Sequence, residues 1–491
     1  MSLTWATLPS SPVAEMPAGI SSGAELAEEL AALVEDESGV RWERVLAALV
    51  TLERGEVAAV KPVLARNSAA FRLGAWGALP YLAEAVRAVL DGTPGHQPAQ
   101  PVTDMVRLAW QDAGVPGRPL IETPADLLKL RAGELAVQAG RAPVPSLLAT
   151  PTHVTGSIDP AVLIDRLARA EAGGWDPWAL DFDQALLRVA VPADAAVLDR
   201  AGTLTSVHGR RLAAWLAGGG LPAPVSTRFE QVFAGVGECA VRRRVVARLR
   251  PGRTEGLPLH LEKALFTVEP PGEPRLRSSS SYLFEALAMA LPHHREVLAA
   301  WFVADVAALA DQDHQGAGML PLLAGRSGPI GPATVAALAY GLCARHAADR
   351  VAAVDAFRTI AATVSPDFAV VVGVELGDLA GDGLVTLSRA VPALADLHQA
   401  GASAAVWEVV AAALPSVLPV ERGRRMAGGV TSPAGPAVSP RGLPDLLELA
   451  ARVAGAVGAR GEIAGLAEVA GRGGSTRVVR EARRLLAAID A

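Results

Sequence analysis

Apolar residues recur at helical spacing along residues 281–418, and this pattern constrains the fold more than any other feature of the chain. One stripe runs through Val335, Leu338, Ala339 and Leu342, at positions i, i+3, i+4 and i+7. A helix with such a stripe buries one face against a neighbour and leaves the other in water. Because the stripes follow one another with short polar or Gly/Pro breaks between them, we predict stacked helix pairs rather than a closed catalytic fold.

The composition favours helices as well. Hydrophobic residues make up 51% of the 491 residues and charged residues 20%, so a large core is expected. Much of the apolar share is Ala and Leu, which form helices readily, whereas Tyr occurs three times and Phe nine times. A chain of this length exceeds one ordinary core, which favours several domains or one elongated array. The prediction is a mainly all-α fold.

The spacing of the expected helix pairs resembles that of repeat proteins. Pairs are expected to begin near Ser281, Pro332, Pro366, Ala402 and Gly442. The separations lie near the ~40–47 residues of HEAT and armadillo units and the ~34 residues of tetratricopeptide units. The spacing therefore predicts a HEAT/armadillo-like α-solenoid. Its helix pairs are degenerate repeats, because no consensus residues recur from one pair to the next.

The order of these features suggests a division of the chain. We expect a flexible lead-in at 1–22, an N-terminal helical region at 23–222, a small β insertion with a linker at 223–280, and a C-terminal HEAT-like array at 281–491 with a mobile loop at 423–442. Asp159-Pro160 is a helix start within the second region, because Asp caps helices and Pro suits the first turn.

A β element is expected within residues 225–268, where β-branched residues such as Val232, Val245 and Val246 alternate with others. Leu257–Val268 is interpreted as a further strand of this element.

One concentration of charge accompanies the β element. It consists of Arg242, Arg243, Arg244, Arg248, Arg250 and Arg253. Arginine forks bind phosphates and carboxylates at two points, so the cluster is a candidate site for an acidic protein partner or for nucleic acid. The simpler alternative is a solvated edge of the β element, where charge prevents pairing with another strand.

Motifs for catalysis and cofactors are weak. The phosphate-binding motif needs a lysine that none of Lys61, Lys129 and Lys263 supplies. His293 and His294 are adjacent and lack zinc-ligand spacing, so a turn between helices explains them better.

Other candidates fail for similar reasons. Asp311 and Asp313 resemble the start of a calcium loop, but Leu322 stands where a bidentate Glu is required. Ser327 lacks the G-x-S-x-G elbow, and Cys343 is expected to be a buried thiol. We therefore predict no catalytic residue, no metal and no cofactor.

Charge and hydropathy limit the partners and the location. The formal net charge of −6 disfavours a generally basic nucleic-acid binder. The longest apolar runs, 298–310 and 368–374, are too short or interrupted for a membrane span of ~20 residues. Residues 1–16 lack the features of a signal peptide. A cytoplasmic protein without membrane contact is expected.

One segment resembles a known family. The residues that carry the likeness are Leu147–Thr152, Gly156, Ile158–Pro160, Leu163, Asp181-Phe182 and Gln184–Arg188. They resemble uncharacterised actinobacterial proteins of helical-repeat (HEAT-like) type, often encoded near SWIM zinc-finger and MoxR-type ATPase proteins. The resemblance implies an accessory or scaffold role beside an ATPase system and supplies no catalytic residues.

The functional prediction is thus a non-enzymatic α-solenoid scaffold that binds a protein partner. One alternative is a helical-repeat protein that binds nucleic acid through Arg242–Arg253. Another is an enzyme whose site residues are too dispersed along the sequence to recognise.

Overall fold

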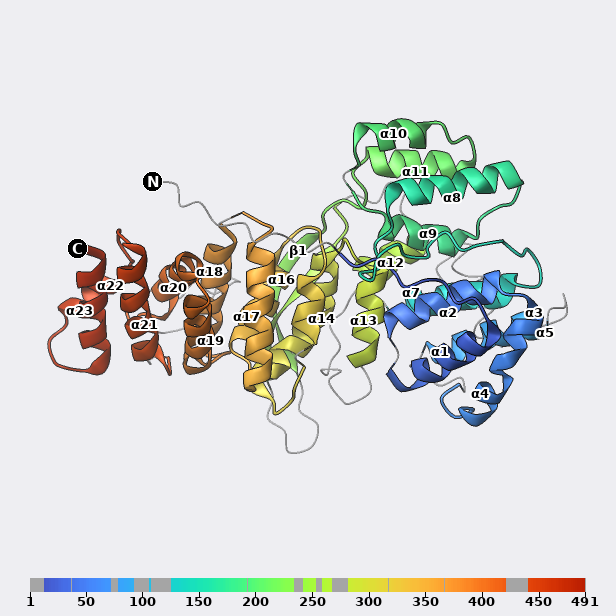
Figure 1. The fold of residues 1–491 in the computed structure, drawn as a ribbon. Helices are drawn as coiled ribbons and strands as arrows, with labels where there is room; N and C mark the ends of the chain where they lie inside the picture. The colour runs from blue at the N-terminus through green and yellow to red at the C-terminus, as the bar shows by residue number, and fades with distance from the viewer. Residues whose placement is uncertain are drawn as a thin grey trace.

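The structure, a computed structural model, describes residues 13–36, 38–71, 78–91, 106, 125–191, 193–233, 242–252, 258–266, 281–316, 318–365, 367–420 and 440–490. These residues are mainly helical and include one two-stranded sheet. The mainly α fold with a small β element is therefore confirmed. Figure 1 shows an elongated molecule, with the helices of the first region at one end and the last helix, α23, at the other.

The first helices pack around a common core. In α1 the stripe Leu26, Leu30 and Leu33 is buried completely, as its spacing requires. The strongest packing in this region joins α5 to α7. The helices are α1 (Gly23–Asp36), α2 (Gly39–Thr51), α3 (Arg54–Val57), the 3₁₀ turn η1 (Ala58–Val60), α4 (Lys61–Arg66), α5 (Leu79–Asp91) and α7 (Ala125–Gln138).

A second group of helices has its own small core around Leu163, Phe182 and Leu212. The predicted helix start at Asp159-Pro160 is confirmed, because the Asp159 carboxylate accepts a hydrogen bond from the N–H of Ala161 (2.7 Å). The helices of this group are α8 (Pro160–Gly173), α9 (Ala179–Arg188), α10 (Ala195–Gly202) and α11 (Val207–Ala217).

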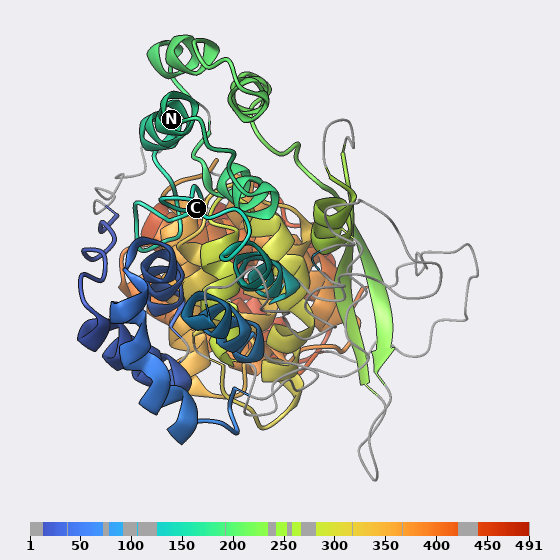
Figure 2. The same cartoon turned by 90° about the vertical axis from the view of Figure 1, so that its right-hand side faces the viewer.

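The sheet is an antiparallel pair of β1 (Val225–Phe233) and β2 (Arg242–Arg250). It packs on two helices of the array, α14 and α16, and Figure 2 shows it at the margin of the molecule. The interpretation of Leu257–Val268 as a strand is wrong: residues 259–266 form the helix α12. Leu261 and Leu265 are buried one helical turn apart, which gives a helix a buried face.

We call the helices from Ser281 onward the array. The predicted starts at 281, 332, 366, 402 and 442 each lie within one residue of the beginning of a helix. Its helices are α13 (Ser281–Ala290), α14 (Arg295–Asp311), α15 (Met319–Ala324), α16 (Pro332–Leu342), α17 (Ala347–Ala361), α18 (Asp367–Gly381), α19 (Leu387–Gln399), α20 (Ser403–Val417), α21 (Leu443–Val457), α22 (Leu466–Gly471) and α23 (Arg477–Asp490).

Helices two places apart in the sequence pack side by side. One row runs α14, α16, α18, α20, and a second runs α15, α17, α19, α21, followed by α23. The backbones of α18 and α20 lie very close together. A Cβ on Gly377 would be 2.6 Å from the carbonyl oxygen of Ala413, and one on Gly381 would be 2.8 Å from that of Ser416. Gly373 faces Val409 in the same way. Glycine thus allows the two backbones to touch.

A buried carboxylate links the first two helices of the α14 row. Glu296 of α14 accepts hydrogen bonds from the N–H groups of Gly331 (2.9 Å), Ala333 (2.8 Å) and Thr334 (3.0 Å). These donors belong to the start of α16 and would otherwise lack partners. Glu296 therefore serves as a cap supplied by another helix.

Helix α13 connects the array to the first region, since it packs on α2, α7 and α9. Two hydrogen bonds strengthen this connection. The Gln184 amide donates to the carbonyl of Ala290 (2.7 Å), and the His294 imidazole bonds the carbonyl of Leu187 (3.0 Å). Residues of α9 thus hold the turn between α13 and α14.

Several predictions fall partly outside the described residues. These include the loop at 423–442, where description resumes at 440, the linker at 267–280 and Arg253. Of the predicted lead-in, residues from 13 onward are described. Met16 donates from its backbone to Thr152 and Val154 donates to Ala14, so this segment lies against the loop before α8.

Candidate functional site

Five of the six predicted arginines, Arg242, Arg243, Arg244, Arg248 and Arg250, lie on β2, and their surroundings differ. Arg244 is 1% exposed and forms an ion pair with Asp311 at the end of α14 (2.7 Å), while its guanidinium lies over the ring of Phe233. Arg242 donates to the backbone carbonyl of Asp311 (2.7 Å). These two side chains are engaged within the protein.

The remaining arginines of β2 make different contacts, and Arg243 points to the other face because successive strand residues alternate. Arg243 is on the opposite face from Arg242, near Glu230 (3.3 Å) and the carbonyl of Asp382 (3.1 Å). Arg248 lies over the ring of Phe229, and Arg250 is exposed. The structure therefore brings Arg242 and Arg244 together and separates Arg243 from them, while Arg253 lies outside the described residues.

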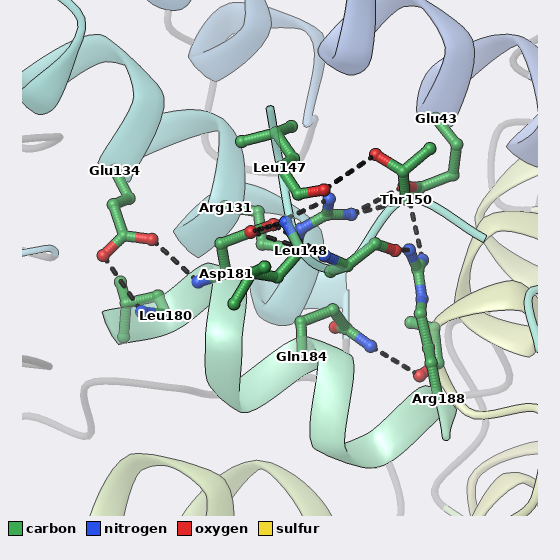
Figure 3. A network of polar contacts seen from close by, with 12 residues as sticks. Glu43, Arg131, Glu134, Leu147, Leu148, Thr150, Leu180, Asp181, Gln184 and Arg188 are labelled. Carbon is green, nitrogen blue, oxygen red and sulfur yellow. Dashed lines mark hydrogen bonds and ion pairs between the residues drawn. The ribbon is translucent and has the colours of Figure 1, made fainter. Parts of the chain in front are cut away.

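A different polar centre lies at the junction of α2, α7 and α9, and Figure 3 shows it from close by. Glu43 accepts hydrogen bonds from Arg131 (2.8 Å to each carboxylate oxygen) and from Arg188 (2.7 Å). Arg131 also reaches Asp181 (3.2 Å). All four residues are no more than 4% exposed. We call Glu43, Arg131, Asp181 and Arg188 the Glu43 network.

The network holds the loop that precedes α8. Asp181 accepts hydrogen bonds from the N–H groups of Leu148 (2.5 Å) and Ala149, and Arg188 donates to the carbonyl of Ala149 (2.6 Å). Arg166 of α8 donates to the carbonyls of Leu148 and Thr150. The loop backbone is thus bound by acceptors and donors from two helices.

The start of α9 is fixed in the same way. Glu134 of α7 is fully buried and accepts hydrogen bonds from the N–H groups of Leu180 (2.9 Å) and Asp181 (2.8 Å). A carboxylate at a helix N-terminus satisfies unpaired donors and interacts favourably with the helix dipole. Glu134 therefore orients the helix that carries Asp181 and Arg188.

Burial and charge act in opposite directions on these groups. Burial would raise the pKa of Glu43, but Arg131 and Arg188 outweigh it and lower the pKa to about 2. Burial lowers the pKa of Arg166 to about 10, which leaves it protonated at neutral pH. Glu43 is therefore charged and paired with Arg131 and Arg188, while Asp181 forms an ion pair with Arg131. Such a set positions backbone and helices, and its charges are already used by one another.

The resemblance rests on residues within 147–188, but the sequence did not predict this geometry. One sequence feature could have indicated a buried ion pair. Glu43 falls among Trp42, Val45 and Leu46 on the buried stripe of α2. A charge at such a position requires a buried partner. The sequence alone cannot say that one partner is Arg188, which is 145 residues away.

His293 lies between two serine hydroxyls. Its Nε2 is 2.9 Å from Ser157 Oγ and its Nδ1 is 2.7 Å from Ser327 Oγ. Burial lowers the pKa of His293 to about 4, so the ring is neutral and one hydroxyl donates to it while the other accepts. A neutral imidazole can act as a base toward serine. His293 and His294 lie in the turn after α13, as predicted.

An open groove of about 190 Å³ lies between α2, α5 and the segment before α8. Its lining, apart from Arg54, is mainly apolar and includes Leu49, Val89, Val144 and Trp178. The indole N–H of Trp178 is bonded to the carbonyl of Ala142 (2.8 Å).

Two observations apply to the described residues as a whole. No helix among them combines the length and apolar character needed to cross a bilayer. Within the same residues, His, Cys, Asp and Glu side chains do not gather in groups of three or more that could hold a metal ion. Cys343 is fully buried, as predicted, and burial raises the pKa of its thiol to about 12.

Residues 29–220 match the model of a family described as a domain of unknown function (DUF7824). The match begins in α1 and ends after α11, so it contains the Glu43 network and the segment that carries the resemblance. It agrees with the expectation of an uncharacterised family for this part of the chain. No curated protein and no solved structure matches the chain.

Proposed function

We propose that the protein is a non-enzymatic α-solenoid scaffold that binds a protein partner along its array. The observation that carries the proposal is the packing of α14, α16, α18 and α20 in one row beside α15, α17, α19 and α21 in another. Helix pairs stacked in this way form a long surface that can bind a partner without a pocket.

The chemistry of the array indicates the kind of partner. Residues 341–420 contain eight carboxylates and four arginines. On α18, Val371 is 50% exposed and Val374 is 44% exposed, and Asp367 is exposed on the same helix. Exposed valines beside carboxylates suit an apolar segment with basic residues, whereas the phosphates of nucleic acid would be repelled.

The engagement of Arg242 and Arg244 with Asp311 also favours a protein partner over nucleic acid. The setting beside an ATPase system rests on the resemblance of residues 147–188, and the cytoplasmic location stays a prediction. The enzyme alternative would use the Ser157–His293–Ser327 cluster, where no carboxylate among the described residues is bonded to His293 as one is in serine hydrolases.

The test is to recover the tagged chain from its native cells after nuclease treatment. We expect a stoichiometric protein partner, and we expect Val371→Asp with Val374→Asp to abolish its recovery. Val207→Asp, at a 70% exposed position on α11, is the matched control and should retain the partner. Recovery of nucleic acid with steep salt dependence, or a partner unaffected by the α18 variant, would contradict the proposal.

A further inference from the structure

Among the residues that the structure describes, strand β1 pairs with β2 on one edge and has no partner strand on the other. The N–H of Val245 in β2 donates to the hydroxyl of Tyr340 (2.8 Å), so the backbone of Val245 points away from β1. Val245 lies opposite Glu230. In an antiparallel pair, the backbone N–H and C=O groups of two opposite residues point either toward each other or both away from the pair. The backbone groups of Glu230 therefore point away from β2.

The same holds for every second residue of β1. The outward backbone groups are those of Ser226, Arg228, Glu230 and Val232, which we call the β1 edge. Within the described residues, no backbone or side-chain group is hydrogen-bonded to these N–H and C=O groups. Val225 is 55% exposed and Val232 is 60% exposed, so the strand is open to solvent at both ends.

The β1 edge lacks several of the features that usually protect an edge strand. The strand has nine residues, contains neither Pro nor Lys, and pairs with β2 one to one without a bulge. Natural sheets shorten, bend or charge such edges to prevent pairing with other chains. The charges present on β1, Arg228 and Glu230, have opposite signs.

These charges complement a second copy of the same strand. In an antiparallel pair related by a two-fold axis at Phe229, Arg228 of each copy lies opposite Glu230 of the other, and Ser226 lies opposite Val232. Outward residues then pair with outward residues, as hydrogen bonding requires. Opposite charges directly across a strand pair stabilise it, and like charges destabilise it.

Other registers are less favourable. An axis at Arg228 would place Arg228 opposite its own copy, and an axis at Glu230 would place two glutamates together. In the register with its axis at Phe229, each Arg228 would also keep its ion pair with Glu375 (3.0 Å) and each Glu230 its ion pair with Arg243 (3.3 Å). The charges would then alternate along one chain across the interface.

We infer that the protein forms a symmetric dimer in which two β1 edges join into a four-stranded antiparallel sheet. A two-fold interface uses the same surface on both copies, and strand addition is a common mode of recognition. This inference does not rest on the proposed partner-binding surface of α18, although Arg228 contacts Glu375 of that helix.

The first test is sedimentation equilibrium of the full chain over a dilution series. We expect a mass of twice 50.5 kDa. Arg228→Glu and Glu230→Arg should each give monomers, because each homodimer would oppose like charges twice. An equimolar mixture of the two variants should restore the dimer, since every cross-strand pair then has opposite signs.

Val232→Pro gives a second test that involves no charge. Its N–H faces outward, so proline removes a donor from the β1 edge and leaves the hydrogen bonds to β2 in place. A folded monomer is expected, with folding checked by circular dichroism. Val351→Asp, at a 53% exposed position on α17, is the control and should remain dimeric.

Three results would overturn the inference. The first is a monomeric wild-type chain at all concentrations. The second is a folded Arg228→Glu, Glu230→Arg or Val232→Pro variant with the wild-type mass. The third is a mixture of the two charge variants that stays monomeric.

Discussion

Where α2, α7 and α9 meet, four charged side chains lie out of contact with water, whereas at the contact of α18 with α20 three glycines bring two backbones together. The Glu43 network depends on each charge having its partner, because an unpaired buried charge is costly. The glycine contact depends on the absence of volume. The first arrangement is sensitive to losing atoms and the second to gaining them.

The two arrangements also differ in how specifically they fix neighbouring segments. The Glu43 network defines the path of the loop at Leu148 and Ala149 through directional hydrogen bonds. The α18–α20 contact fixes how closely two helices approach, with one polar link from Ser416 to Asp378 (2.8 Å). Substitutions should therefore have clearly different effects on stability in the two regions.

The largest effect is expected for Glu43→Leu. It would leave Arg131 and Arg188 without this shared carboxylate, and breaking a buried ion pair costs about 3–5 kcal/mol. The free energy of unfolding by denaturant should fall by that amount, and hydrogen exchange should rise in α2, α7 and α9. Asp165→Ala, which breaks an exposed pair with Arg200, is the control and should cost about 0–1 kcal/mol. Equal losses in both variants would contradict the role of burial.

Gly377→Ala should destabilise the α18–α20 contact by about 3 kcal/mol, near the upper end of overpacking costs, because its Cβ would press on the carbonyl of Ala413. Gly455→Ala on α21 is the matched control, since nothing lies near its Cβ, and it should stabilise by about 0.5–1 kcal/mol. Denaturant unfolding measures both. A neutral Gly377→Ala would mean that the two helices separate without cost.

Acid should weaken the connection between α9 and the start of α14, where His294 bonds the carbonyl of Leu187. Burial lowers the pKa of His294 to about 3 from its ordinary 6.5, so the unfolded state binds a proton that the folded state refuses. Stability is therefore complete above pH 6.5 and falls as the pH drops through that value toward 3. Between pH 7 and pH 5 this histidine should cost about 2 kcal/mol.

The check is to compare the wild-type chain with His294→Gln across this pH range. The glutamine side chain cannot take up a proton, but its amide keeps a donor for the carbonyl of Leu187. The variant's loss of stability on acidification should therefore be smaller by about 2 kcal/mol. His293, whose pKa is also lowered, leaves a residual slope of the same sign. Identical pH dependence in the two proteins would rule out His294 as the cause.

The smallest effect is expected for Asp159→Ala, which removes the N-cap of α8 and should cost about 1 kcal/mol. Thr386 occupies the equivalent position before α19 but makes no capping hydrogen bond. Thr386→Ala should therefore change the melting temperature less than Asp159→Ala does. The reverse order would contradict the assignment of the cap.

The sequence predicts local features of this fold better than distant contacts. Helix starts such as Asp159-Pro160 depend on neighbours within one turn, and they are confirmed. The strand predicted at Leu257–Val268 is wrong because a short apolar run fits either a strand or a helix until its burial is known.

The Glu43 network depends on the tertiary fold in a way that no local pattern encodes. Arg244 illustrates the same limit, because its position in an arginine run predicts exposure and its contact with Asp311 in another element makes it buried.

The capping of α16 by Glu296 has a mechanical consequence. Sliding α16 along α14 by a single residue, about 1.5 Å, would pull three N–H donors off one carboxylate at once. The two helices therefore move together, and a force applied to α16 reaches α14 without slip. His294, at the beginning of α14, in turn bonds the carbonyl of Leu187, so this rigid connection continues from α16 through α14 to α9.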